Sequence, residues 1–203
     1  MTTGDRNRVE RRARQRNASR TDILDAARRV ASRKRARDLS LRSVAAEAGF
    51  APAALYGYFR SKDELLLALA ADDLADIVQA MRQAMAAPGA NGRFSAAGAA
   101  ALDRLSRTET LAAAPGAMGS GATNGDVERL FNGRLIAALT ELSAAIGKPA
   151  RARESQFDVL LIAAALTGLA LLTRTGRLRA LGFDATELLA RLEQRFSAEP
   201  QVS

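Results

Sequence analysis

The sequence predicts an all-α protein with an N-terminal head of three helices and a helical C-terminal body. Alanine, leucine and arginine dominate its 203 residues, and runs of β-branched residues are absent. Apolar residues recur at the spacing of an α-helix throughout the chain. A chain of this length holds one moderately large domain or two small ones. We divide it into a basic arm over residues 1–18, the head over 19–65 and the body over 66–203.

The head is predicted to contain a helix-turn-helix. Its first helix covers residues 19–34, and Ser40 caps the second. Gly49 then supplies a position where a left-handed turn costs little, and a proline opens a third helix over residues 52–58. The inner faces of the first two helices are Ile23, Leu24, Ala27, Val30 and Ala31, then Leu41, Val44, Ala45 and Ala48. A helix, a glycine turn and a second helix are the arrangement that delivers a helix to the major groove of DNA.

Apolar, glycine, tyrosine and lysine residues follow one another at fixed spacings along this segment. They are Ile23, Leu24, Ala27, Val44, Ala45, Ala48, Gly49, Leu55, Tyr56, Phe59, Lys62 and Leu65. In this pattern the stretch from Ser19 to Leu69 resembles the tetracycline-repressor (TetR-like) family of bacterial transcriptional regulators. The resemblance implies a sequence-specific DNA-binding repressor that a small-molecule effector releases from an inverted-repeat operator.

The resemblance also implies that the third helix enters the major groove while Tyr56, Tyr58 and Lys62 hold phosphates. Ser40 would offer its hydroxyl or backbone N–H to a phosphate at the start of the second helix, and we assign Ser43 to the same interface. The third helix presents residues without hydrogen-bonding side chains, namely Ala51, Pro52, Ala53 and Gly57. Such a surface reads thymine methyl groups and shape rather than guanine or adenine edges.

Arg42, at the start of the second helix, is our candidate for direct base reading. A bidentate arginine–guanine contact discriminates by about 1–3 kcal/mol. A phosphate contact and a plain surface charge both stay open for Arg42. For Tyr56 the alternative is a packing tyrosine, whereas Leu55 and Phe59 are expected in the core of the head.

The first 42 residues carry all of the chain's positive excess. They hold 14 Lys and Arg against 5 Asp and Glu, whereas residues 43–203 hold 16 against 17 and the whole chain is at +8. Such a cluster favours a polyanionic partner. A solvated, disordered tail also fits residues 2–17, but beside a helix-turn-helix we favour an arm that follows the DNA backbone or enters the minor groove. The alternative function is a helical interaction protein that binds anionic membrane or RNA through this arm.

The body is predicted to begin with a long fourth helix that ends near Met85. Ser61 and Glu64 open this helix as a capping box. Further helices are predicted over residues 93–113, 126–146 and 150–175, and from Asp184 to about residue 197. The segment 114–125 is too rich in glycine and small residues for regular structure.

A homodimer is expected, because a two-fold operator needs two heads about one DNA turn apart, roughly 34–36 Å. The apolar stretch 159–172 is shorter than a membrane span of about 20 residues, and we interpret it as part of a soluble helix buried on nearly all sides. It is apolar on more sides than one small body could cover, so we favour a dimer interface over the core helix of a monomer. The expected interface residues are Leu161, Ala164, Gly168, Leu172, Leu188, Leu192 and Phe196.

The resemblance further implies a chamber for a small molecule among the middle helices. The candidates for its lining are Met81, Met85, Phe94, Leu102, Leu105, Met118, Phe131 and Leu135. This lining suits an apolar effector, and methionines adapt to irregular ligands. Ordinary core packing is the alternative for each of these residues.

The chain contains no histidine and no cysteine. This composition excludes histidine general bases, Ser-His-Asp and Cys-His sites, thiolate zinc sites and disulfides. We therefore expect a protein that is not an enzyme and that uses no metal or other cofactor. The first residues, MTTGDRNRVERR, lack the apolar core of a secretory signal, and we expect a cytoplasmic protein without a membrane partner.

Overall fold

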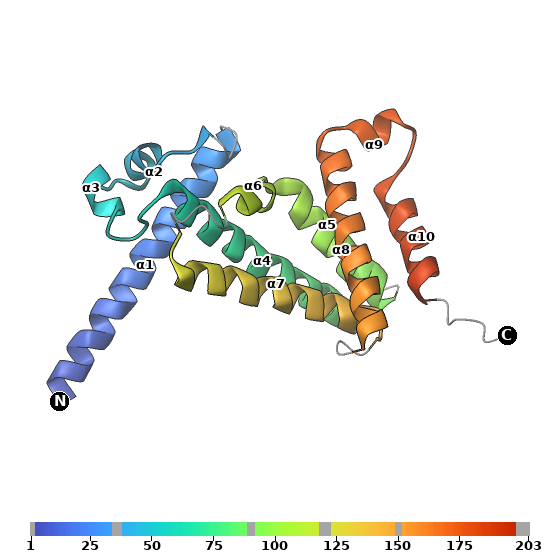
Figure 1. Cartoon of the computed structure of the whole chain (residues 1–203), viewed down its shortest axis with the longest axis horizontal. Coiled ribbons are helices and arrows are strands. Elements are labelled where there is room, and N and C mark those ends of the chain that lie inside the picture. The colour runs from blue at the N-terminus through green and yellow to red at the C-terminus, as the bar shows by residue number, and fades with distance from the viewer. Residues whose placement is uncertain (1–2, 34–37, 89–91, 118–122, 149–151, 198–203) are drawn as a thin grey trace. The chain divides into compact units, whose positions relative to one another are not determined.

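The computed structural model describes residues 3–33, 38–88, 92–117, 123–148 and 152–197 (Figure 1). Regular structure within these ranges is helical and no strand occurs in them, which confirms the predicted fold class. The helices are α1 (Thr3–Arg33), α2 (Leu41–Ala48), α3 (Pro52–Leu55), α4 (Lys62–Ala86), α5 (Arg93–Arg107), α6 (Thr110–Ala117), α7 (Gly125–Ala145), α8 (Arg153–Arg174), α9 (Arg177–Ala180) and α10 (Ala185–Ser197).

The chain folds into two compact units. The first comprises residues 1–70 and 112–129, and the second comprises residues 71–111 and 130–203. Helices α1 to α3 belong to the first unit and α5, α8, α9 and α10 to the second, while α4, α6 and α7 contribute residues to both. The first unit thus includes a segment, 112–129, that our sequence division assigns to the body.

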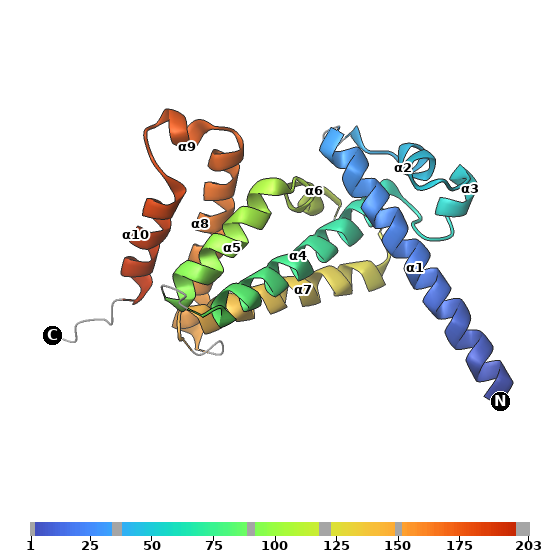
Figure 2. The same cartoon turned by 180° about the vertical axis from the view of Figure 1, so that it is seen from behind.

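Helix α1 is longer than predicted. It begins at Thr3 rather than at Ser19 and ends at Arg33. Ser19 does not cap a helix, because its hydroxyl donates to the backbone carbonyl of Gln15 at 3.1 Å, a bond made inside a continuing helix. Both views show α1 running past α2 and α3 and extending beyond them at its N-terminal end (Figure 1 and Figure 2).

The apolar faces predicted for the head form the core of the first unit. Helix α2 packs against both α1 and α3. The buried side chains are those of Ile23, Leu24, Ala27, Val30, Leu41, Val44, Ala45, Leu55 and Phe59, joined by Leu65 and Leu69 from the start of α4. Ala31 and Ala48, which we also placed on these faces, are half-buried. The hydrophobic period of the sequence therefore identified the inner side of the head.

Local hydrogen bonds set the two ends of α2. The Ser40 hydroxyl accepts from the N–H of Ser43 at 3.1 Å, and the Ser43 hydroxyl accepts from the N–H of Ser40 at 3.2 Å. At the other end Gly49 has a φ of 73°, in the left-handed region that glycine adopts at low cost. The predicted cap and the predicted glycine turn are both confirmed.

Helix α3 is shorter than predicted, since it ends at Leu55 and residues 56–58 form a turn. The N–H groups of Tyr58 and Phe59 both donate to the carbonyl of Leu55 at 2.9 Å. Ala51 provides no side-chain cap, and glycine at position 57 has a poor helix propensity, which agrees with a helix that ends at Leu55.

The start of α4 is held by the predicted capping residues, with one difference. The Ser61 hydroxyl accepts from the N–H of Glu64 at 3.0 Å. The Glu64 carboxylate accepts from the N–H of Arg60 at 2.9 Å, one residue before the position that a capping box uses. Glu64 is buried by this arrangement.

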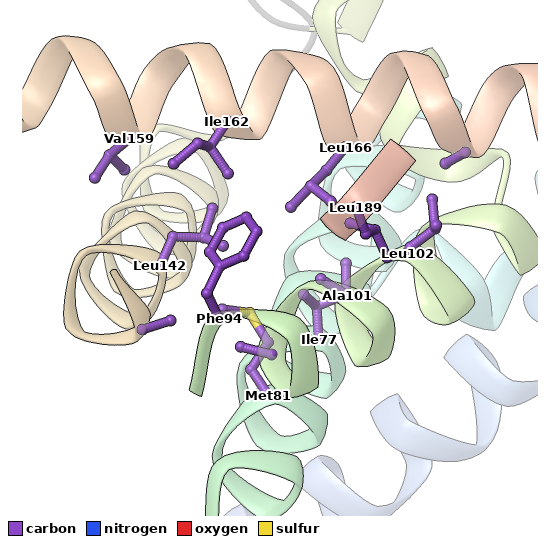
Figure 3. Close-up of a cluster of buried hydrophobic side chains, with 13 residues drawn as sticks. Ile77, Met81, Phe94, Ala101, Leu102, Leu142, Val159, Ile162, Leu166 and Leu189 are labelled. Carbon is purple, nitrogen blue, oxygen red and sulfur yellow. The ribbon is translucent and has the colours of Figure 1, made fainter. Parts of the chain in front are cut away.

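The second unit has one continuous hydrophobic core. Helix α5 packs along α8, and α10 packs against both. The core consists of Ile77, Met81, Phe94, Ala97, Ala101, Leu102, Leu142, Ala145, Val159, Ile162, Leu166, Ala170 and Leu189. Figure 3 shows Val159, Ile162 and Leu166 of α8 pointing into this cluster.

The predicted helix over residues 93–113 is in fact two helices, α5 and α6. The chain leaves the helical conformation at Thr108, where φ is −115° and ψ is 141°. The hydroxyl of Thr108 donates to Asp73 Oδ2 at 2.7 Å, and the hydroxyl of Thr110 donates to the same oxygen. Helix α6 then runs to Ala117, into a segment that we predicted to be irregular. The helix therefore breaks at Thr108, where the chain hydrogen-bonds to Asp73 of α4. The spacing of apolar residues in the sequence did not reveal this break.

Helix α8 is not buried on nearly all sides within one chain, and that prediction is wrong. Its buried residues are Ser155, Val159, Ile162, Leu166 and Ala170, which share one face. On the opposite face Phe157, Leu160, Leu161 and Leu171 are each more than half exposed. By length and composition α8 could also cross a membrane, a criterion that core helices of soluble proteins meet as well.

Candidate nucleic-acid interface

The third helix presents a small, apolar surface. Ala51, Pro52, Ala53 and Gly57 are all exposed, whereas Leu55 is fully buried. The N–H of Ala54 donates to the carbonyl of Ala51 at 2.9 Å, and that of Gly57 donates to the carbonyl of Ala54 at 3.1 Å. Methyl groups and the proline ring are therefore what this surface offers to a partner, and such groups recognise thymine methyls and shape.

Ser40 and Ser43 lie at the exposed start of α2, and each hydroxyl has a partner. The two hydroxyl oxygens are 3.0 Å apart, and that of Ser43 also donates to the Ser40 carbonyl at 2.8 Å. The side chains thus shape the helix start. The Ser43 N–H is taken by the Ser40 hydroxyl, and the dipole of α2 favours an anion at this end.

Arg42 extends from the same turn of α2 and is exposed. Its side chain lies one residue from the capping Ser43 on a helix whose two ends are both fixed. This places a cation at the N-terminal end of α2, where a guanidinium can bind either a base edge or a phosphate.

Tyr56, Tyr58 and Lys62 follow α3 within seven residues. Tyr56 is 60% exposed, so its ring is not a core residue of this chain. Tyr58 is half-buried, and its ring meets that of Phe50 edge to face with 6.2 Å between the centroids. Lys62 is half-buried at the first position of α4. Two phenol groups and one ammonium group thus follow the apolar surface of α3.

Two arginines of the head were missed by the sequence reasoning. Arg60 is exposed in the short connection between Phe59 and α4. Its charge beside the motif was a visible signal. Arg20 of α1 lies with its guanidinium carbon 5.0 Å from the centroid of the Phe59 ring, a contact across 39 positions that no local pattern contains.

Charge pairs join α1 to α2. Arg29 Nε donates to Glu47 Oε1 at 2.7 Å, and the guanidinium of Arg33 donates to the other oxygen of the same carboxylate. The hydrogen bonds from Arg29 and then from Arg33 lower the pKa of Glu47 below its usual range. These two arginines are therefore engaged within the head.

The basic segment before Ser19 continues α1 rather than forming a separate arm. The helix includes residues from Thr3 onward. Most side chains of this segment lie outside the described residues. Arginine and alanine are good helix formers, which agrees with a helical extension.

Most of the predicted effector residues are packed rather than arranged around a cavity. Met81, Phe94 and Leu102 belong to the core of the second unit, and Met85 and Leu105 pack against it. Phe131 is buried, Leu135 is 38% exposed and Met118 lies outside the described residues. A groove of about 280 Å³ lies elsewhere, and its lining is Ile136, Leu139, Thr140, Ser143, Gln156, Val159 and Leu160.

The predicted dimer residues divide into two groups. Leu161, Ala164 and Gly168 are exposed on the outer face of α8, and Leu172 is half-buried. Leu188, Leu192 and Phe196 of α10 are also half-buried, but Leu192 and Phe196 pack against the core of their own unit. Large exposed apolar residues that we did not select are Phe157, Leu160, Leu171, Leu181 and Phe183.

No group of acidic side chains in the described part of the chain could hold a metal ion. The groups of the head that we assign to the interface are hydroxyls, guanidinium groups and one ammonium group. Groups of these kinds bind anions.

Comparisons with known proteins agree with this geometry. Residues 23–69 match the family described as bacterial regulatory proteins, tetR family. No curated protein matches the chain.

Solved structures share the fold over most of the chain. A protein of unknown function from Rhodococcus sp. RHA1 is 26% identical, with a TM-score of 0.64 over 88% of this chain and 93% of that one. A TetR-family transcriptional regulator from Streptomyces coelicolor is 22% identical, with a TM-score of 0.60 over 88% and 99%. The transcriptional regulator FadR from Bacillus subtilis, solved in complex with stearoyl-CoA, is 16% identical, with a TM-score of 0.59 over 88% and 97%.

Proposed function

Because residues 23–69 carry the DNA-binding segment of the tetR family of bacterial regulatory proteins, we propose that this chain represses transcription by binding an inverted-repeat operator. The observation that carries the proposal is the arrangement of the head: α2, the left-handed turn at Gly49, and a third helix with an exposed apolar face. Arg42 is exposed in the first turn of α2, and Tyr56 and Lys62 follow α3 in the chain. A reading element flanked by anion-binding groups is what groove recognition requires.

In this proposal the contacts have different tasks. Ala51, Pro52 and Ala53 meet thymine methyl groups, while Arg42 reads a guanine edge. Phosphates are held by Tyr56, Tyr58, Lys62 and the N-terminal end of α2. These contacts fix the register of the head on the duplex. Phosphate contacts make the affinity depend steeply on salt.

Selection of bound sites from random duplex DNA tests the proposal. The expected product is a short inverted repeat with half-sites about one helical turn apart, roughly 10 base pairs. Binding of the selected site should weaken as the salt concentration rises. A selection that enriches no inverted repeat would contradict the proposed function.

The operator's symmetry requires two copies of the chain, and the outer face of α8 supports this. Phe157, Leu160, Leu161 and Leu171 expose apolar side chains on the same helix face as the small residues Ala164 and Gly168. Small residues allow a second helix to approach closely, and an exposed apolar patch of this kind marks an interaction site. We place the centre of the dimer interface on α8.

A small apolar molecule is proposed as the effector. The second unit offers a core of leucine, methionine and phenylalanine side chains among α4, α5 and α7, which we retain as the binding region. Since Met81 and Phe94 are almost fully buried, a ligand must displace packed side chains to enter. Release of a labelled operator by apolar compounds, with a matching rise in melting temperature, tests this part of the proposal.

The proposed place of action is the cytoplasm. The helical extension of α1, with its excess of arginine, also supports the alternative of binding RNA or an anionic membrane. Competition separates the two: the selected operator should displace RNA and anionic vesicles from the protein, whereas neither should displace the operator.

A further inference from the structure

We propose that Arg20 is a phosphate-binding residue of the DNA interface and that the ring of Phe59 holds it in position. This inference rests on the proposed function, because it assigns one more contact to the same interface. It differs from the phosphate-binding groups expected from the sequence, since Arg20 lies on α1 and meets the interface only in the folded head.

The Phe59 ring that Arg20 contacts is held in place by the core of the head. Phe59 is fully buried, and its N–H donates to the carbonyl of Leu55 at 2.9 Å. The guanidinium carbon of Arg20 lies 5.0 Å from the centroid of this ring, within the range of a cation–π interaction. Arg20 itself is half-buried, so its stem is covered while part of the side chain reaches the surface.

Stacking leaves the guanidinium able to bind an anion. A guanidinium is planar and directs its N–H groups outward in its own plane, so the face that covers a ring uses none of them. Within the described residues no carboxylate pairs with Arg20. A bound phosphate would supply the missing partner.

Three other arginines of α1 whose side chains the structure describes differ from Arg20. Arg28 is paired with Asp25 at 3.0 Å, and Arg29 and Arg33 are both paired with Glu47. These pairs partly neutralise their charge within the head. Arg20 is held instead by a ring that carries no net charge, so its full positive charge remains available to DNA.

The ring belongs to the same short segment of the chain as the proposed phosphate-binding residues. Phe59 lies between Tyr58 and the exposed Arg60, and it follows Tyr56 by three residues. The basic extension of α1 continues on the N-terminal side of Arg20. Arg20 therefore links two positively charged parts of the head, and a cation between them can neutralise one further phosphate.

The salt dependence of operator binding tests the proposal. In Arg20→Met the stem still covers the Phe59 ring, but the charge is lost. The logarithmic slope of affinity against salt should become shallower by about 0.9 for each head, and all operator sequences should weaken alike. Arg28→Met is the matched control on the same helix, and its slope should equal that of the unaltered protein.

Thermal melting of each variant separates binding from folding. If Arg20→Met lowers the melting temperature but leaves the salt slope unchanged, the stack is only structural and the proposal is overturned. Should the methionine variant fail to fold, Arg20→Gln takes its place with the same expected loss of slope. If the Arg20 variants bind the operator with the salt slope of the unaltered protein, the role of Arg20 is overturned but the proposed function stands. The proposed function itself fails only if the unaltered protein selects no operator.

Discussion

Arg29 of α1 donates to Glu47 of α2 at 2.7 Å, and this bond ties the first helix of the head to the second. Arg33 donates to the same carboxylate, so one acidic side chain holds two basic ones. These two ion pairs connect α1 to α2, the helix that begins the DNA-reading motif. The ends of α2 are set separately by Ser40 and Gly49.

The stability of the head should depend on pH through Glu47. Its pKa is lowered in the folded state by the bonds from Arg29 and Arg33, so the ionised form stabilises the fold at neutral pH. This stabilisation is present above the pKa of an unfolded glutamate, about 4.3, and is lost as the pH falls through the lower folded value. Glu47→Gln should therefore lower the free energy of unfolding at pH 7, and the difference from the unaltered protein should vanish in acid.

Urea unfolding of both proteins at neutral and acidic pH measures this difference. Glu154→Gln, which changes an exposed acid on α8, is the control for the loss of a carboxylate that makes no ion pair with Arg29 or Arg33. A Glu47→Gln effect of the same size at every pH would rule out the ion pairs as its cause.

Arg42→Ala should change base preference rather than affinity alone. Loss of a bidentate guanine contact costs about 1–3 kcal/mol on the preferred operator and much less on operators altered at that base pair. Lys62→Ala should instead weaken all operators alike and make the salt slope shallower by about one. Titration of both variants against operators with single-base changes distinguishes base reading from phosphate binding. Uniform losses for Arg42→Ala would make it a phosphate contact.

Leu161→Asp should dissociate the proposed dimer. Leu161 is 59% exposed on the outer face of α8, and burial of a leucine stabilises by about 1.5–3 kcal/mol. A symmetric dimer buries Leu161 from both chains, so the substitution removes two buried leucines. The dissociation constant of the dimer should therefore rise by about a hundredfold or more. Ala99→Asp adds the same charge at an exposed position of α5 and should leave the dimer intact. Sedimentation equilibrium compares the two, and equal dissociation constants would place the interface elsewhere.

Gly49→Ala and Gly133→Ala should shift stability in opposite directions. Neither added methyl group would meet an atom within 4 Å. Gly49 has a φ of 73°, where a non-glycine residue costs about 1–2 kcal/mol. Gly133 lies within α7 without a positive φ, so alanine should stabilise by about 0.4–1 kcal/mol. Thermal unfolding measures both, and a neutral Gly49→Ala would show that the α2–α3 turn can relax.

Deletion of residues 1–18 should weaken operator binding while sequence preference remains. The remaining head keeps α2, α3 and the start of α4, whereas the lost segment carries basic residues. The change in salt slope, about 0.9 per phosphate, gives the number of phosphates that the extension neutralises. Complete loss of DNA binding with an otherwise folded protein would favour the alternative of a nonspecific basic arm.

Much of the head was predictable because its signals are local. The Ser40 cap, the turn at Gly49 and the start of α4 at Ser61 each depend on residues within four positions of one another. The buried face of α1 follows from hydrophobic period alone, as Ile23 and Ala27 demonstrate. The motif that predicts DNA binding lies in the same segment, and the match over residues 23–69 agrees with it.

Errors arose where a distant partner or a continuing helix overrode the local signal. Ser19 reads as a cap in the sequence, but its hydroxyl bonds to Gln15 within α1. Thr108 lies within a helical pattern, yet the chain leaves the helix there and bonds to Asp73 in α4. The candidate effector residues have the composition of a ligand chamber, but packing against neighbouring helices fills the space around Met81 and Phe94.

Composition and neighbours along the chain are enough to establish the all-α class, the helix-turn-helix and the excess of positive charge in the first 42 residues. The packing of the helices was needed to show that Phe196 faces inward, that Leu161 faces outward and that the Arg20 guanidinium lies over Phe59. Apolar residues at helical spacing can serve a core or an interface equally well, and the choice is made by which helices pack around them.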